Sequence, residues 1–219
     1  MTRDEALERC RRWREIADRI QAEAMQRLSA PALVEQTRRL GLTRGRTPLL
    51  GRASPGVLLA FDLAFYTAKE GRSRPLDRYA KSAGFPPGSD EASVLDAMRR
   101  ARFSLWRVLR RHETAGLAVQ DTLRGGEAWL MDEGIEHGAP DGGVFAGRLF
   151  DAGAFALTCG IYVPVGEAMM EDLLRDPHAL RRADPAQAAD DPRFAAALYR
   201  AAVETGALDG IAQAAPEPG

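Results

Sequence analysis

One carboxylate stands inside the most apolar stretch of the sequence. Residues 56–69 are apolar nearly all round, and Asp62 lies among them, one helical turn before Tyr66. A buried carboxylate needs a partner, and Tyr66, Arg74 or Arg78 could supply one. Such a carboxylate is either a general acid or base with a shifted pKa, or half of an ion pair that fixes the helix to the following loop. We favour the structural ion pair.

A group of arginines lies around the same stretch. Its members are Arg44, Arg46, Arg72, Arg74 and Arg78. Because guanidinium groups bind phosphates and nucleic-acid backbones, this group is a possible anion-binding site. It lacks the interleaved aromatic residues that single-strand-binding proteins use for base stacking. A solvated basic surface is therefore the preferred interpretation.

No local motif for catalysis, nucleotide binding or metal binding occurs in the sequence. The Gly-x-Ser-x-Gly nucleophile elbow and the glycine-rich phosphate-binding and dinucleotide-binding loops are absent. The acidic run at 132–137 lacks the register of a calcium loop. Neither triad nor metal-ligand spacing is found among His112, His137, His178, Cys10 and Cys159. We therefore expect no metal and no cofactor.

Charge is distributed unevenly along the 219 residues. Residues 1–112 hold 23 Lys or Arg and 13 Asp or Glu, which gives +10, whereas residues 113–219 hold 7 and 18, which gives −11. This near-cancellation favours contact between the halves, within one chain or in a homo-oligomer, over a nucleic-acid partner. The first residues form no apolar signal-peptide core, and no stretch is long and apolar enough to span a membrane. We expect a cytoplasmic protein without membrane contact.

The hydrophobic period changes from helical to alternating near residue 103 and back after residue 165. Alternation is clearest at 117–123 and 155–163, and glycine-containing turns separate five strand-like segments. We expect residues 103–165 to form a five-stranded antiparallel barrel of OB or SH3 type, because a sheet this small hides its edges best by closing. Its expected core includes Leu117, Val119, Phe155, Leu157 and Ile161.

Helices are expected on both sides of the barrel, which makes the fold class α+β. Apolar stripes at three- and four-residue steps predict an N-terminal helical part over 1–102 and a C-terminal helical cap over 166–212. Residues 43–55 are expected to form a loop, and 132–137 a polar connection between strands. Residues 213–219 are expected to be a disordered tail. The whole chain is expected to form one compact unit.

Several segments resemble a group of uncharacterised bacterial proteins with alphaproteobacterial members. They are FDLAF at 61–65, LDRY at 76–79, AMRRARFSL at 97–105, GLAVQDTL at 116–123 and GGVFAGR at 142–148. Some similar proteins also carry a SEC-C-like zinc tail, of the type found at the carboxyl end of the preprotein translocase ATPase. That cysteine-rich segment is absent here, so the resemblance implies no metal site. It implies the helix-plus-barrel architecture, and no activity that can be transferred.

The biochemical function stays unknown from the sequence. We favour a non-enzymatic cytoplasmic binding or adaptor protein with a protein partner or a second copy of itself. One alternative is a nucleic-acid- or ribosome-associated factor that uses the basic N-terminal half. A second alternative is an enzyme whose site is assembled from residues distant in sequence, since many sites have no local signature.

Overall fold

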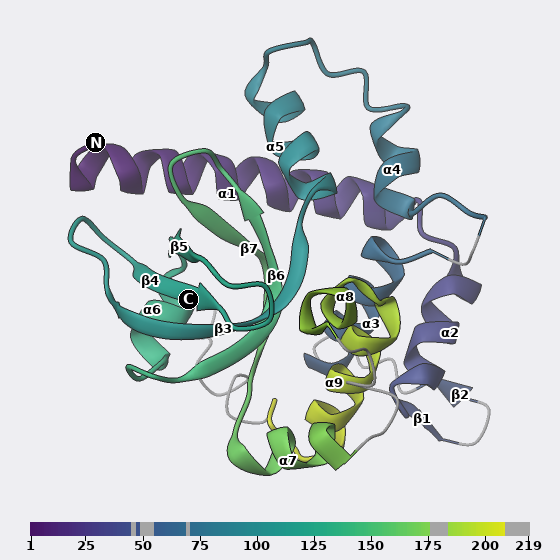
Figure 1. Ribbon diagram of the computed structural model, residues 1–219. Helices are drawn as coiled ribbons and strands as arrows, with labels where there is room; N and C mark the ends of the chain where they lie inside the picture. The colour runs from purple at the N-terminus through teal and green to yellow at the C-terminus, as the bar shows by residue number, and fades with distance from the viewer. Residues whose placement is uncertain (45–46, 49–54, 69–70, 176–183, 209–219) are drawn as a thin grey trace, which may run out of the picture.

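A computed structural model describes residues 1–44, 47–48, 55–68, 71–175 and 184–208 of the chain. Helices precede and follow a small barrel (Figure 1). The elements before the barrel are α1 (Arg3–Gln26), α2 (Ala30–Arg39), β1 (Thr43–Arg44), β2 (Thr47–Pro48), α3 (Pro55–Tyr66), α4 (Pro75–Ala80) and α5 (Asp90–Arg99). Those after it are α7 (Glu167–Arg175), α8 (Pro185–Asp190) and α9 (Pro192–Glu204). The α+β class with helices on both sides of a small barrel is thus confirmed.

Five strands close into the barrel in the order β3, β4, β5, β7, β6. They are β3 (Arg102–Arg111), β4 (Leu117–Asp121), β5 (Glu127–Leu130), β6 (Val144–Asp151) and β7 (Ala156–Pro164). One short helix, α6 (Glu133–Gly138), connects β5 to β6. The expected five-stranded closure is confirmed.

The expectation of a purely antiparallel barrel is wrong. Four neighbouring pairs are antiparallel, whereas β5 and β7 run parallel with Leu130 opposite Ala156. The reason is geometric, because directions cannot alternate all the way round a closed ring of five strands. At least one neighbouring pair must be parallel, and the connection through α6 lets β7 close the ring beside β5.

The barrel interior differs in part from the predicted core. Leu117 and Val119 lie inside it, in one cluster with Trp106, Val108, Leu130, Phe145 and Leu149. Phe155 and Leu157 are equally buried, but they pack in a cluster with α1 and α5 on the outer wall. Ile161 is partly buried against the cluster that contains α3 and α9. Strand β7 is covered on both faces, so its alternation could not distinguish the interior from the helix-facing side.

Helix α1 lies along the outside of the barrel (Figure 1). Thr2 begins it with a capping box, in which its hydroxyl accepts from the backbone N–H of Glu5. The buried face of the helix includes Trp13, Ile16 and Ile20. Arg14 donates to the carbonyl oxygen of Thr158 at 2.6 Å and forms an ion pair with Asp132 at 3.2 Å. These contacts join the first helix to β7 and to the start of α6.

Two connections carry more structure than expected. Within 43–55, β1 and β2 pair antiparallel, with Thr43 opposite Pro48. The acidic run forms α6, because the Asp132 side chain accepts the backbone N–H of Ile135 at 3.1 Å and so caps a helix. The predicted tail at 213–219 lies outside the described residues. None of the described helices is both long and apolar enough to cross a membrane.

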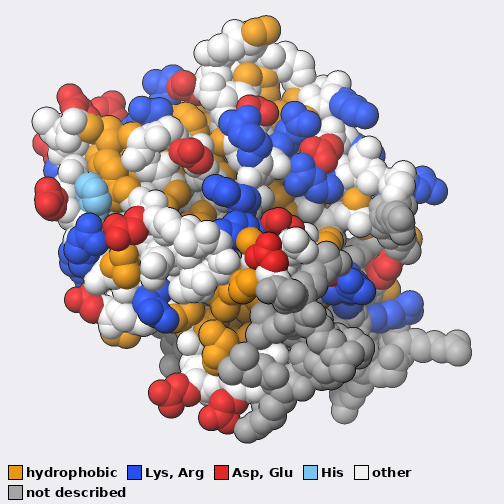
Figure 2. Space-filling view, in the orientation of Figure 1, with side chains coloured by type: hydrophobic (Ala, Val, Ile, Leu, Met, Phe, Trp, Pro, Cys, Tyr) orange, Lys and Arg blue, Asp and Glu red, His pale blue; other side chains and the backbone are white. Residues whose placement is uncertain are grey.

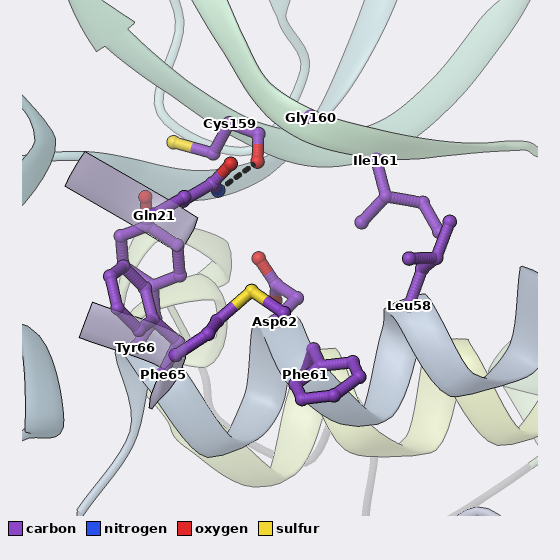
Figure 3. A pocket seen from close by; sticks show the side chains of 10 residues that line it. Gln21, Leu58, Phe61, Asp62, Phe65, Tyr66, Cys159, Gly160 and Ile161 are labelled. Carbon is purple, nitrogen blue, oxygen red and sulfur yellow. Dashed lines mark hydrogen bonds between the residues drawn. The ribbon is translucent and has the colours of Figure 1, made fainter. Parts of the chain in front are cut away.

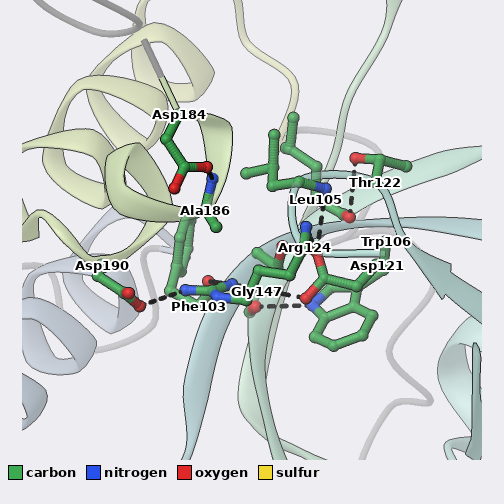
Figure 4. Close-up of polar contacts among 12 residues, drawn as sticks. Phe103, Leu105, Trp106, Asp121, Thr122, Arg124, Gly147, Asp184, Ala186 and Asp190 are labelled. Carbon is green, nitrogen blue, oxygen red and sulfur yellow. Dashed lines mark hydrogen bonds and ion pairs between the residues drawn. The ribbon is translucent and has the colours of Figure 1, made fainter. Parts of the chain in front are cut away.

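Arg124 joins α8 to the barrel. Its side chain is 12% exposed and donates to the carbonyl oxygen of Phe103 at 2.9 Å and to the carboxylate of Asp190 at 2.5 Å (Figure 4). The Asp121 carboxylate accepts the backbone N–H groups of Leu123 and Arg124, both at 3.0 Å. This holds the turn that leads from β4 towards β5.

Candidate binding pocket

A β-bulge interrupts the pairing of β6 with β7. Gly147 lies opposite Tyr162 and Leu149 opposite Thr158, so Arg148 alone faces the three residues 159–161. Gly160 sits in the bulge with a φ of +101°, which L side chains rarely adopt. Bulges re-aim side chains and are frequent beside functional sites. Here the bulge lies above helix α3 (Figure 3).

A pocket of about 170 Å³ lies between this bulge, α3 and α1. Its roof is formed by residues 159–161 of β7 and its floor by α3 (Figure 3). Gln21 and Met25 of α1 close one side. Most of the lining is apolar, and Leu58 at 50% exposure marks its connection to the surface.

Asp62 is the charged residue on the pocket floor, and Arg148 neutralises it. Arg148 Nε donates to both carboxylate oxygens, at 3.2 Å and 3.0 Å, and the Tyr199 hydroxyl donates to one of them at 3.1 Å. Burial raises the pKa of Asp62, although Arg148 and Tyr199 lower it in part. Burial alone would lower the pKa of Arg148, but the Asp62 carboxylate, together with Tyr199 and Cys159, raises that pKa overall.

Aromatic rings hold the Arg148 guanidinium in place. Its central carbon lies 5.0 Å from the ring centre of Tyr66 and 5.4 Å from that of Phe103. Phe103 in turn packs edge-on against Tyr199, with ring centres 5.4 Å apart. Such cation–π contacts favour a desolvated guanidinium. The ion pair is therefore positioned by β3, β6, α3 and α9 together.

Tyr66 and Cys159 form a closed corner of the pocket. The Tyr66 hydroxyl is enclosed and makes no hydrogen bond of good geometry with any described residue. It lies beside the Cys159 thiol, whose pKa burial raises to about 12, although Tyr66 lowers it in part. A thiol that stays protonated to such a pH is a poor nucleophile. Cys159 therefore contributes shape rather than reactivity.

Gln21 links α1 to the roof. Its Nε2 donates to the carbonyl oxygen of Cys159 at 2.7 Å (Figure 3). A Cβ atom added to Gly160 would lie 3.5 Å from the Oε1 of Gln21, so this oxygen lies next to the bulge. No described residue donates a hydrogen bond to this Oε1. Asp62 and Gln21 thus give the pocket two hydrogen-bond acceptors.

None of the residues suggested as partners of Asp62 forms a hydrogen bond with it in the structure. Arg74 donates to Asp77 at 2.7 Å and to the carbonyl oxygen of Arg99 at 2.9 Å. Arg78 donates to the carbonyl oxygen of Ser73 at 2.5 Å. Tyr66 contacts the partner arginine through its ring and not the carboxylate through its hydroxyl. The structure pairs Asp62 with Arg148 and Tyr199 instead, because α3 packs against β7 beside the bulge and against α9.

Of the proposed anion-binding arginines, the structure describes the side chains of Arg72, Arg74 and Arg78. Arg74 and Arg78 are engaged as described, and Arg72 is exposed. Arg44 ends β1, and Arg46 lies outside the described residues. Within the described ranges, no three His, Cys, Asp or Glu side chains group closely enough to hold a metal ion. Anion binding by these arginines stays a prediction.

Sequence reasoning missed Arg148, Tyr199 and Cys159 as neighbours of Asp62. The one available signal was Gly160, a glycine in an otherwise regular alternation, which is typical of a bulge. It indicates where a strand is distorted, but not which helix faces it.

Comparisons with known proteins identify one family. A model described as "Family of unknown function (DUF7986)" matches residues 4–207. No curated protein and no solved structure matches the chain. Membership of the bacterial group that the sequence resembles stays a prediction.

Proposed function

The chain belongs to the family of unknown function DUF7986, and we propose that it is a binding protein for small, largely apolar molecules. One observation carries the proposal. An apolar pocket of about 170 Å³ opens beside the exposed Leu58 and has the carboxylate of Asp62 on its floor. Binding sites are typically apolar concavities with a few convergent polar groups.

The size of the pocket restricts the ligand. An engineered protein cavity of about 150 Å³ lined by aliphatic and aromatic groups binds benzene. A pocket of about 170 Å³ therefore suits one ring with a short substituent. Drug-sized ligands occupy roughly 300–1,000 Å³ and are too large for it.

The geometry favours binding over catalysis. The carboxylate of Asp62 is already neutralised by Arg148 at 3.0 Å, and the Cys159 thiol has a pKa of about 12. A nucleophile needs to be deprotonated, and protonation of Asp62 as a general base would break its ion pair with Arg148. The described lining of the pocket is therefore poorly suited to either role. This supports the non-enzymatic interpretation.

The barrel itself argues against the nucleic-acid alternative. Numbered within the barrel, its strands follow the order one, two, three, five, four, with a helix between the third and fourth, and we infer that it is of the OB type. OB barrels bind oligonucleotides across strands two and three and the loops that join strands one to two and four to five. Here α1 contacts both loops, since Arg3 donates to the carbonyl oxygen of Thr114 at 3.0 Å and Arg9 to that of Ala152 at 3.0 Å. Both loops that OB barrels use for oligonucleotides are thus in contact with this chain's own helix α1.

The distribution of surface charge also argues against a nucleic-acid partner. Figure 2 shows acidic and basic side chains interspersed on the visible face, without a continuous basic stripe. Arg110 and Arg111 of β3 pair with Glu127 at 3.5 Å and Glu136 at 3.3 Å. A nucleic-acid-binding surface usually presents uncompensated basic residues.

The test is a titration of ethylbenzene into the nitrogen-15-labelled protein, followed by NMR. We expect saturable shifts at the backbone amides of residues 159–161. Leu58→Trp places a large ring at the pocket entrance and should abolish them, because Leu58 is half exposed and its replacement leaves the core intact. Glu8→Trp, on the exposed side of α1, is the matched control and should bind normally. Absence of saturable shifts, or equal binding by Leu58→Trp, would contradict the proposal.

A further inference from the structure

We infer that the pocket selects uncharged one-ring molecules whose polar group donates a hydrogen bond, such as a secondary alcohol. The inference rests on the proposed function and specifies its ligand class. It follows from which polar side-chain atoms of the pocket can still form a hydrogen bond, and from the neutralisation of Asp62 by Arg148.

The side-chain polar atoms that a ligand can reach, on Asp62 and Gln21, are acceptors. The Asp62 carboxylate receives Arg148 Nε and the Tyr199 hydroxyl, which leaves lone pairs on the oxygen that accepts only the arginine. Figure 3 shows this carboxylate directed from α3 towards the roof of the pocket. Gln21 Oε1 stands beside Gly160 on the opposite wall. A ligand that offers a donor can satisfy either group.

The side-chain donors of the lining residues Gln21 and Tyr66 are already engaged or enclosed. Gln21 Nε2 is bonded to the carbonyl oxygen of Cys159. The Tyr66 hydroxyl is fully enclosed beside the Cys159 thiol, where a ligand atom cannot reach it. A ligand that only accepts hydrogen bonds would place its polar atom against a carboxylate or an apolar wall. Such an unpaired polar group is costly.

Charge excludes ionic ligands. Asp62 and Arg148 cancel each other, and their side chains are only 4% and 9% exposed. An anion would face the carboxylate in a desolvated site. A cation would leave a net positive charge beside the buried guanidinium of Arg148. A neutral donor avoids both penalties and adds one hydrogen bond to a charged acceptor.

Aromatic side chains favour a ring as the apolar part of the ligand. Phe61 and Phe65 of α3 line the floor, and Ile161 and Leu58 lie towards the entrance (Figure 3). Stacked or edge-on ring contacts add to the burial of apolar area. The ligand class is therefore a ring with a short hydroxyl- or N–H-bearing substituent.

Four probes with one carbon skeleton test the inference. Ethylbenzene, acetophenone, 1-phenylethanol and 1-phenylethylammonium differ only in the polar group on the same carbon. We expect 1-phenylethanol to bind at least about tenfold tighter than acetophenone, the ratio that a hydrogen bond to a charged acceptor provides. The ammonium should bind more weakly than the alcohol. Calorimetric titration gives each dissociation constant.

A variant identifies the acceptor. The double substitution Asp62→Leu with Arg148→Met replaces the ion pair by apolar groups of similar size, a change that folded proteins often tolerate. Whatever its affinity for ethylbenzene, it should reduce the preference for the alcohol over the ketone by about tenfold. If this variant does not fold, the comparison of probes on the natural protein still decides the question.

The outcomes separate the inference from the proposed function. If ethylbenzene and acetophenone bind in the pocket as well as the alcohol does, the ligand class is wrong and the binding function stands. Tightest binding of the ammonium likewise overturns the inference, since it shows that the site prefers a cation. If none of the four probes binds, both the inference and the proposed function fail.

Discussion

Arg148 Nε lies 3.0 Å from a carboxylate oxygen of Asp62, and both side chains are almost completely buried. The two residues are 86 positions apart in the sequence. Their contact joins the barrel to helix α3 at the point where the β-bulge interrupts β7. A buried ion pair of this kind specifies how two elements fit together more than it adds stability.

Removal of one member of this pair should be costly. Asp62→Asn or Arg148→Met alone leaves the other polar group buried without its charge partner, and we expect a loss of about 3–5 kcal/mol in the free energy of unfolding. The double substitution Asp62→Leu with Arg148→Met should recover most of that loss, since no unpaired charge remains. Urea unfolding at neutral pH measures all three variants. A single variant as stable as the natural protein would show that the pair has no structural role.

Two glycines with similar backbone angles should respond differently to alanine. Gly116 and Gly125 have φ values of +72° and +79°, so a side chain strains both. A Cβ at Gly116 would lie 2.2 Å from the carbonyl oxygen of Leu130, whereas one at Gly125 meets nothing within 4 Å. We expect Gly125→Ala to cost about 1 kcal/mol and Gly116→Ala at least about 2 kcal/mol more. Equal melting temperatures of the two variants would contradict the close approach of β4 and β5.

Local patterns predicted the elements of this fold but not the contacts between distant ones. The alternation at 117–123 identified β4, and the apolar stretch around Asp62 identified a buried helix. One parallel pair, here β5 with β7, could have been predicted from the sequence, because an odd number of strands cannot close in alternating directions. The partner of Asp62 could not have been predicted in this way. Any of the many arginines in the sequence could pair with a buried carboxylate, and only the packing of α3 beneath the bulge selects Arg148.

The interior and exterior of the barrel illustrate the same limit. Leu117 and Leu157 both alternate with smaller or polar residues, and both are fully buried. One points into the barrel and the other towards α1, because helices cover the outer wall. A period of two reports that a strand has two faces, and it does not tell which face is inside when both are buried.

Alkaline pH should destabilise the fold between pH 10 and 12. Burial and the hydrogen bond to Glu23, which Tyr79 donates at 2.7 Å, raise the pKa of Tyr79 to about 12. The unfolded chain has a tyrosine pKa of about 10. Since the folded pKa is the higher one, the stabilising contribution is complete below pH 10 and is lost as the pH rises towards 12. Burial also raises the pKa of Tyr66 and Tyr199 well above 10.

Tyr79→Phe tests this assignment. The variant should be less stable at neutral pH, because Glu23 loses its hydrogen bond, and its stability should fall less steeply above pH 10. Unfolding midpoints in urea, measured in steps of pH with tyrosinate absorbance as a second readout, give the two slopes. Identical slopes for the variant and the natural protein would show that another group accounts for the alkaline loss.

Hydrogen exchange should distinguish a substitution in the barrel interior from one on the outer face that α1 covers. Leu157 is fully buried in the cluster that contains α1, and Leu117 is 1% exposed in the interior cluster. Truncation of either to alanine should cost about 2–5 kcal/mol, since each deletion leaves a cavity in a packed region. The two substitutions should, however, increase hydrogen exchange in different parts of the structure.

Leu157→Ala removes apolar contact between α1 and β7, so the amides of α1 should lose protection before those of the strands. Leu117→Ala acts inside the ring of strands, so β3, β4 and β5 should exchange faster while the α1 contacts at Phe155 and Leu157 persist. Faster exchange throughout the chain in both variants, with no difference between α1 and the strands, would mean that the helix and the barrel unfold as a single cooperative unit and that this prediction is wrong.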